Sequence, residues 1–149
     1  MPKIKRILFP TDFSPNAKAA QAHVQSLAED LKAEVHVLFV AEGLSLEAPD
    51  STSLFVTPAD SLEQVCRSAM PYLHKLFDSE WSQQHHVVHA TRIGRPFREI
   101  IKYADENQID LIIAGTHGHT GPLRILLGSV AENLVRHANC PVMTVRPPA

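Results

Sequence analysis

Four of the six glycines of this 149-residue chain fall within fifteen residues, in the stretch GTHGHTGPLRILLGS that runs from Gly115 to Ser129. This glycine loop has no acidic residue and follows the apolar run IDLIIAG. Glycine is favoured where the main chain turns sharply or closely approaches another group. Its last residues, Gly128 and Ser129, precede the helical pattern VAENLV, and the free amides of a helix start attract anions. The spacing therefore indicates an anion site, with phosphate as the first candidate.

The glycine loop differs from two familiar phosphate loops, and it also suits a role without any ligand. It has no Gly-Lys-Ser/Thr and is not a Walker A loop, and its spacing differs from that of a Gly-x-Gly-x-x-Gly turn. Ser129 and Glu132 have the spacing of a capping box, which would stabilise the helix by itself. Both functions are compatible, because main-chain amides can bind phosphate while the serine side chain caps the helix.

Composition excludes some classes of function. The formal charge of −2 gives no electrostatic reason to expect a nucleic-acid partner. No apolar run approaches the roughly 20 residues of a spanning helix, so we expect no membrane insertion. Cys66 and Cys140 lie far apart without a Cys-x-x-Cys motif, which fits a reducing cytoplasm. The length suits one domain over residues 1–149.

The apolar pattern predicts strands that alternate with helices. We expect strands at 3–10, 34–41, 85–93, 109–116 and 140–146, and helices at 15–31, 60–83, 95–108 and 129–138. Ser14 should cap the first helix with Pro15 at its first position, and Pro71 should kink the second. Residues 42–59, rich in Pro, Ser and Thr, should form a long connection.

This alternation is typical of an α/β fold, an open parallel sheet with helices on both faces. Ligands of such sheets bind at the carboxyl ends of the strands, where the strand order reverses. The tripeptide PTD follows the first predicted strand, and the glycine loop follows the fourth. If these strands are neighbours, both segments face one crevice.

Histidines and carboxylates give little support for catalysis. His85, His86 and His89 form HHVVH, but neighbouring residues of a strand point to opposite faces, so we do not expect a metal site there. His117 is a better candidate for ligand contact because it lies inside the Gly-x-x-Gly turn. No Ser/His/Asp or Cys/His arrangement is visible, and no carboxylate pair flanks the glycine loop. We therefore do not expect a dedicated hydrolase.

The segment GTHGHTGPLRILLGSVAENLVRHANCPVMTV resembles the carboxyl-terminal signature of the universal stress protein family, in its ATP-binding branch. The motif of that branch, G-x2-G-x9-G-(S/T), is matched by Gly115, Gly118, Gly128 and Ser129. The segment RILFPTDFSPNAKAA resembles the amino-terminal signature, so the resemblance covers essentially the whole chain. It implies a five-stranded parallel sheet of order 3-2-1-4-5, a Rossmann-like fold of the adenine nucleotide alpha hydrolase-like type.

The resemblance also implies a nucleotide between the first and fourth strands. Asp12 would contact the ribose or lie near Mg²⁺, Val40 would pack on adenine, and the start of the last helix would hold the phosphates. The ligand would be ATP, or AMP or ADP, with Mg²⁺ bridging phosphates. The implied site residues are Pro10, Thr11, Asp12, Val40, Gly115, Thr116, His117, Gly118, Gly128, Ser129 and Val130.

Three functions remain in competition. The first is an ATP-binding regulatory protein of the stress response, acting on a protein partner that the sequence does not identify. The second is a slow ATPase or another nucleotide-processing enzyme, although PTDFSP lacks the HxGH-like element of adenylating enzymes. The third is a nucleotide-free dimeric scaffold, which the intact glycine motif argues against. In the family the last strand, here from Pro141 to Arg146, pairs with its twofold mate, so we expect a homodimer.

Overall fold

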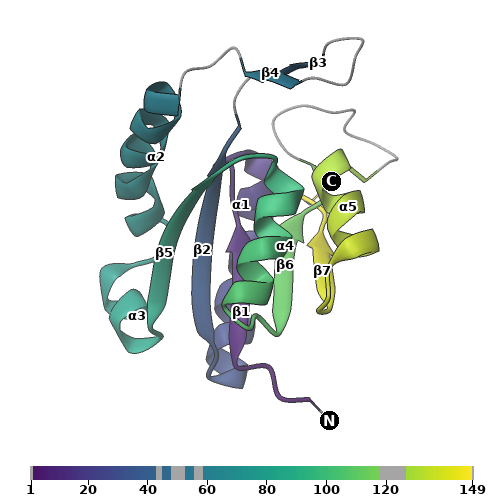
Figure 1. Cartoon of the computed structure of the whole chain (residues 1–149). Helices are drawn as coiled ribbons and strands as arrows, with labels where there is room; N and C mark the ends of the chain where they lie inside the picture. Colours follow the sequence, from purple (N-terminus) through teal and green to yellow (C-terminus); the bar gives the residue numbers. More distant parts are fainter. Residues whose placement is uncertain (1, 43–44, 48–52, 56–58, 118–126, 149) are drawn as a thin grey trace.

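The computed structural model describes residues 2–42, 45–47, 53–55, 59–117 and 127–148 (Figure 1). Gly118, Pro122 and Arg124 therefore lie outside the described residues. The elements follow in the order β1 (Arg6–Pro10), α1 (Pro15–Leu31), β2 (Glu34–Ala41), β3 (Ser45–Glu47), β4 (Ser53–Phe55), α2 (Ala59–His74), α3 (Ser79–Gln84), β5 (Val87–Ile93), α4 (Pro96–Glu106), β6 (Leu111–Gly115), α5 (Ser129–His137) and β7 (Val142–Val145).

The main sheet has the order β5-β2-β1-β6-β7, and every neighbouring pair is parallel. Without the small hairpin this is the predicted order 3-2-1-4-5, so the predicted fold is confirmed. Figure 1 shows α4 and α5 on the near face of the sheet, with α1 behind it. The chain leaves β1 toward β2 on one side and reaches β6 on the other, so the strand order reverses between β1 and β6.

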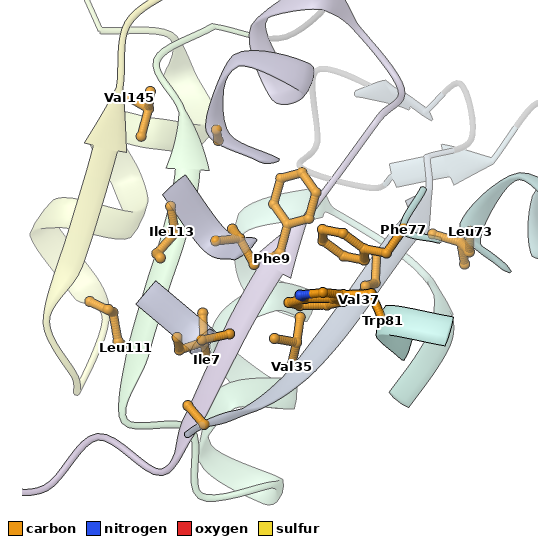
Figure 2. Close-up of a cluster of buried hydrophobic side chains, with 14 residues drawn as sticks. Ile7, Phe9, Val35, Val37, Leu73, Phe77, Trp81, Leu111, Ile113 and Val145 are labelled. Carbon is orange, nitrogen blue, oxygen red and sulfur yellow. The ribbon is translucent and has the colours of Figure 1, made fainter. Parts of the chain in front are cut away.

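Alternate residues of the central strand supply two separate cores. Ile7 and Phe9 are fully buried in the cluster under α1, α2 and α3, whereas Leu8 is fully buried in the cluster under α4 and α5. Figure 2 shows the first cluster, where the rings of Phe77 and Trp81 lie beside Phe9. Burial on both faces explains why these strands are nearly continuous apolar runs.

The first helix begins as predicted. The Ser14 hydroxyl caps α1 and accepts a hydrogen bond from the Ala17 amide at 3.2 Å, with Pro15 at the first helical position. The apolar residues Ala17, Ala20, Val24 and Ala28 are buried, whereas Leu31 at the end of the helix is 42% exposed. The Ser14 cap fixes the point where the chain leaves β1 and enters α1.

Two predictions in the middle of the chain are wrong. The connection at 42–59 contains the antiparallel hairpin of β3 and β4. The helix expected at 60–83 divides into α2 and α3, because Asp78 accepts a hydrogen bond from the Glu80 amide and starts a new helix. Pro71 lies inside α2 and does not end it. Val65 of α2 is 45% exposed. No helix in the described ranges is long and apolar enough to cross a membrane.

A buried polar chain ties β2 to α4. The two ring nitrogens of His36 lie 2.6 Å from the Tyr103 hydroxyl and 2.5 Å from a Glu34 carboxylate oxygen. Burial raises the pKa of Tyr103, so this hydroxyl keeps its proton. The polar chain therefore holds α4 against the sheet.

We expect Tyr103→Phe to lower the free energy of unfolding by about 1–3 kcal/mol, because it leaves a buried ring nitrogen of His36 without its partner. Urea denaturation measures the effect. Tyr72→Phe is the matched control, since Tyr72 is 64% exposed and should tolerate the loss of its hydroxyl. Equal free energies of unfolding of Tyr103→Phe and the wild type would show that this polar chain does not stabilise the fold.

Candidate functional site

A pocket of about 360 Å³ lies at the carboxyl edge of β1, β2 and β6, where the strand order reverses. Its wall also includes residues from the first turns of α1, α4 and α5. The structure brings together all the predicted site residues that it describes. They are Pro10, Thr11, Asp12, Val40, Gly115, Thr116, His117, Gly128, Ser129 and Val130.

Sequence reasoning missed several residues that line the same pocket, and most of them are apolar. They are Ala17, Leu38, Glu42, Pro96, Ile100, Ala114 and Ala131. Residue spacing along β2 and along α4 could have indicated some of them. Leu38 lies two residues before Val40 on β2 and so faces the same side, and Pro96 and Ile100 are four apart on α4.

The turn between β1 and α1 places Thr11 and Asp12 in the pocket wall. The Thr11 amide donates to the Leu38 carbonyl at 2.9 Å, which fixes the turn to β2. An Asp12 carboxylate oxygen accepts a hydrogen bond from the Ser14 amide at 3.0 Å. Asp12 therefore supports the start of α1, as a purely structural role requires, and lines the pocket as well.

Two glycines of the motif are required by the packing of the protein itself. A Cβ on Gly115 would lie 2.6 Å from the main-chain oxygen of Asn16, at the start of α1. A Cβ on Gly128 would lie 2.9 Å from the Thr116 carbonyl oxygen, which accepts a hydrogen bond from the Gly128 amide at 2.7 Å. This bond joins the two ends of the glycine loop, so β6 sets the position at which α5 begins.

The predicted capping box at the start of α5 is wrong. Gly128, not Ser129, is the N-cap residue, and no side chain caps the helix there. Glu132 instead pairs with Arg136 along the helix, with 3.0 Å between the charged atoms. Because Gly128 must pack closely on Thr116, the helix starts one residue earlier than the box requires.

This shift leaves the first turn of α5 open toward the pocket. Ser129, Val130 and Ala131 all line the pocket. Among the described residues none accepts a hydrogen bond from their main-chain amides, as expected for the first turn of a helix. These amides and the positive end of the helix dipole are suited to attract an anion.

His117 adds a side-chain group to the same wall. Its Nδ1 lies 3.1 Å from the hydroxyl of buried Thr116. Its Nε2 is buried and has no hydrogen-bond partner within the part of the chain that the structure describes. When Nε2 carries the proton, it can donate to a ligand oxygen.

The charge of the pocket wall is set by few groups. Its described residues include the carboxylates of Asp12 and Glu42 and the imidazole of His117, but no lysine or arginine. Among the described residues of this wall, a ligand with several phosphate charges would meet main-chain amides rather than lysine or arginine side chains. A divalent cation would strengthen the binding of such a ligand, because it offsets the negative charges of both the phosphates and the carboxylates.

The histidines of HHVVH do not share a strand. His85 is the C-cap of α3, and its ring stacks on that of Trp81 with centroids 4.3 Å apart. His89 lies on β5, and its ring is tilted against that of His74 with centroids 3.9 Å apart. The prediction that His85 belongs to the same strand as His89 is therefore wrong. Across the described ranges, no three His, Cys, Asp or Glu side chains come together as a metal site.

The His74–His89 pair predicts how stability depends on pH. Burial lowers the pKa of His89 below its ordinary value of 6.5, and the neighbouring His74 lowers it further. The unfolded chain therefore binds this proton first, so the free energy of unfolding should fall as pH drops below 6.5 and level off below the folded pKa. Urea denaturation between pH 5 and 8 should show a shallower fall for His89→Leu, whereas exposed His23→Gln should follow the wild type. Identical pH profiles for His89→Leu and the wild type would contradict this prediction.

An open parallel sheet whose strand order reverses in its middle defines a doubly wound α/β protein, and a pocket at that point is where such proteins usually bind small ligands. The model of the universal stress protein family matches residues 3–146. The chain belongs to this family.

Two relatives from Methanocaldococcus jannaschii support the assignment. Universal stress protein MJ0531 is 35% identical over 147 residues, which are 97% of this chain and 83% of that protein. Universal stress protein MJ0577 is 31% identical over 153 residues, which cover 95% of this chain and 94% of that protein. The solved structure of MJ0577 superimposes with a TM-score of 0.72 at 29% identity and covers 99% of both chains.

More distant solved structures share the fold. A universal stress protein in complex with cAMP has a TM-score of 0.66 at 17% identity and covers 99% of this chain and 100% of its own. The universal stress protein from Archaeoglobus fulgidus in complex with dAMP has a TM-score of 0.58 at 17% identity and covers 97% of this chain and 99% of its own.

Proposed function

We propose that the protein binds an adenine nucleotide, ATP first among them, and acts as a regulatory protein of the stress response. One observation carries the proposal. Residues that the sequence indicated, from PTD at the end of β1 to the start of α5, line one pocket, and the first main-chain amides of α5 have no hydrogen-bond partner among the described residues. The site residues of the proposal are those predicted from the sequence, with Gly118 lying outside the described residues.

The two ends of the pocket suit the two ends of a nucleotide. Leu38, Val40 and Ile100 offer an apolar wall for a base, and the first turn of α5 with His117 offers donors for phosphate oxygens. The family membership supports the same ligand class, as do the cAMP and dAMP complexes of the structural neighbours. Residues 1–149 would act as one universal stress protein domain.

Mg²⁺ fits the donor set of the pocket. The carboxylates of Asp12 and Glu42 and the hydroxyl of Ser129 are oxygen ligands of the kind that Mg²⁺ prefers, and all three residues line the pocket. The ion would bridge phosphate oxygens and offset the charge that the wall does not neutralise. Fast hydrolysis is not part of the proposal, because Asp12 is already engaged by the Ser14 amide.

Mass spectrometry of small molecules released by denaturing the freshly purified protein tests the proposal. We expect an adenine nucleotide at close to one per chain. Calorimetric titration of stripped protein should then give binding of ATP with Mg²⁺ and weaker binding of GTP as the matched control for the base. No released nucleotide and no heat with Mg-ATP would favour the scaffold, whereas steady ADP production from ATP would favour the slow ATPase.

We also infer a homodimer through β7. This strand is an edge of the main sheet, and Val142 and Met143 on it are half-buried. An edge strand offers unpaired main-chain groups to a second chain. Light scattering at micromolar concentration should give twice the mass of the chain, and a monodisperse monomer would contradict the dimer. The free thiols of Cys66 and Cys140 suit the cytoplasm, which is the compartment we propose.

A further inference from the structure

Phe13 has a main-chain conformation that a bulky residue rarely adopts. It lies between Asp12 and the helix cap Ser14, and its φ is +62°. This left-handed region is costly for a residue with a large side chain, and such strain persists only where surrounding contacts enforce it. The contacts that hold Phe13 in this conformation therefore also hold the turn that contains Asp12.

Two kinds of contact hold Phe13. Its amide donates to the Thr11 hydroxyl at 3.0 Å, and the next amide, that of Ser14, donates to Asp12 at 3.0 Å. Its ring stacks on Phe39 with centroids 5.5 Å apart and tilts against Tyr72 at 5.9 Å. The hydrogen bonds use the side chains of the two pocket residues, and the rings lie on the other side of the sheet.

The strand β2 separates the two sides. Phe39 packs with the cluster under α1 and α2, whereas its neighbours Leu38 and Val40 pack with the opposite cluster and line the pocket. The turn from Thr11 to Ser14 joins β1 to α1, and within it Thr11 and Asp12 line the pocket while Phe13 packs with the cluster under α1 and α2. The aromatic stack thus contacts the turn on the side of the sheet opposite the pocket, while Thr11 and Asp12 line the pocket.

We propose that Phe13 is a positioning residue of the pocket, whose ring, held by Phe39 and Tyr72, keeps the Thr11 and Asp12 side chains in place for the ligand. Phe13 does not itself line the pocket. The proposal rests on the proposed nucleotide binding for its effect on affinity, but its claim about the turn can be measured without a ligand.

Phe13→Ala and Phe13→Gly separate positioning from stability. Both remove the ring, but glycine adopts a positive φ freely, so Phe13→Gly should unfold at higher urea than Phe13→Ala. If the ring positions Asp12, the glycine variant should bind Mg-ATP at least as weakly as the alanine variant, with both about tenfold weaker than the wild type. Phe13→Tyr should restore wild-type affinity, because it keeps the ring.

A second pair probes the stack away from the pocket. Tyr72→Ala should weaken Mg-ATP binding by about threefold, and Tyr72→Phe should bind like the wild type, because only the alanine variant loses the ring. Hydrogen exchange of the Ser14 amide, which donates to Asp12, should speed up in Phe13→Ala and Tyr72→Ala.

The outcomes distinguish this proposal from the proposed function. If the wild type binds no nucleotide, the proposed function fails, and the exchange of the Ser14 amide still decides the claim about the turn. Unchanged exchange in Phe13→Ala overturns the positioning role, and so does wild-type affinity of both Phe13 variants. The positioning role is also overturned if affinity follows stability, so that Phe13→Gly binds Mg-ATP more tightly than Phe13→Ala.

Discussion

Ser129→Pro is expected to weaken Mg-ATP binding by about ten- to a hundredfold, the range for one hydrogen bond to a charged group. Proline removes the Ser129 amide, which lines the pocket without a partner among the described residues. The fold should accept the change, because Ser129 is the first residue of α5 and Gly128 before it has a ψ of 160°. Isothermal titration gives the affinity, and urea denaturation should show nearly unchanged stability.

Ser129→Ala is the matched control for this prediction. It removes the hydroxyl and keeps the amide, so it should lose much less affinity than the proline variant. Equal losses in the two variants would assign the contact to the hydroxyl. Wild-type affinity of Ser129→Pro would show that the start of α5 does not hold the ligand.

Gly115→Ala should lower the free energy of unfolding by about 3 kcal/mol, near the upper end for overpacking a core. The added Cβ would lie 2.6 and 2.8 Å from the main-chain oxygen and carbon of Asn16. Main-chain atoms cannot rotate aside, so the start of α1 would have to move away from β6. Urea denaturation measures the loss.

Gly128→Ala offers a graded comparison for the same measurement. The nearest atom to its added Cβ is the Thr116 carbonyl oxygen at 2.9 Å, so its loss of stability should be smaller than that of Gly115→Ala. Wild-type stability of Gly115→Ala would mean that the close approach of β6 and α1 is not needed.

The sequence was sufficient for the sheet because its strands and helices alternate with clear periods. The helix Pro15–Leu31 and the strand Glu34–Ala41 have the predicted bounds. The hairpin of β3 and β4 was missed because proline and serine near it indicate a loop. The division of α2 from α3 was missed because apolar residues continue at helical spacing through Phe77, while the decisive signal was the single cap Asp78.

Most of the candidate site was predicted from polar or glycine residues that mark a strand end, whereas the family resemblance implied the apolar Val40 and Val130. Most of the residues that were missed are apolar. Leu38 and Ile100 have the same chemistry as core residues, so only their spacing from Val40 and Pro96 could have indicated that they line the pocket. The capping box failed because of a contact that is distant in the sequence. Ser129 and Glu132 satisfy its spacing, but the close packing of Gly128 on Thr116 sets the helix start, and this contact joins segments that no local pattern relates.

The pairing between β1 and β6 has a consequence for how the chain folds. These strands are in register only at Ile7↔Leu111 and Leu8↔Ile112, whereas β1 meets β2 along its whole length from Arg6↔Glu34 to Pro10↔Leu38. Closing a contact over such a long stretch of sequence costs more chain entropy and comes late in folding. The amino-terminal half should therefore assemble first and the carboxyl-terminal half dock onto it last, so partial opening would split the molecule along the line of the pocket.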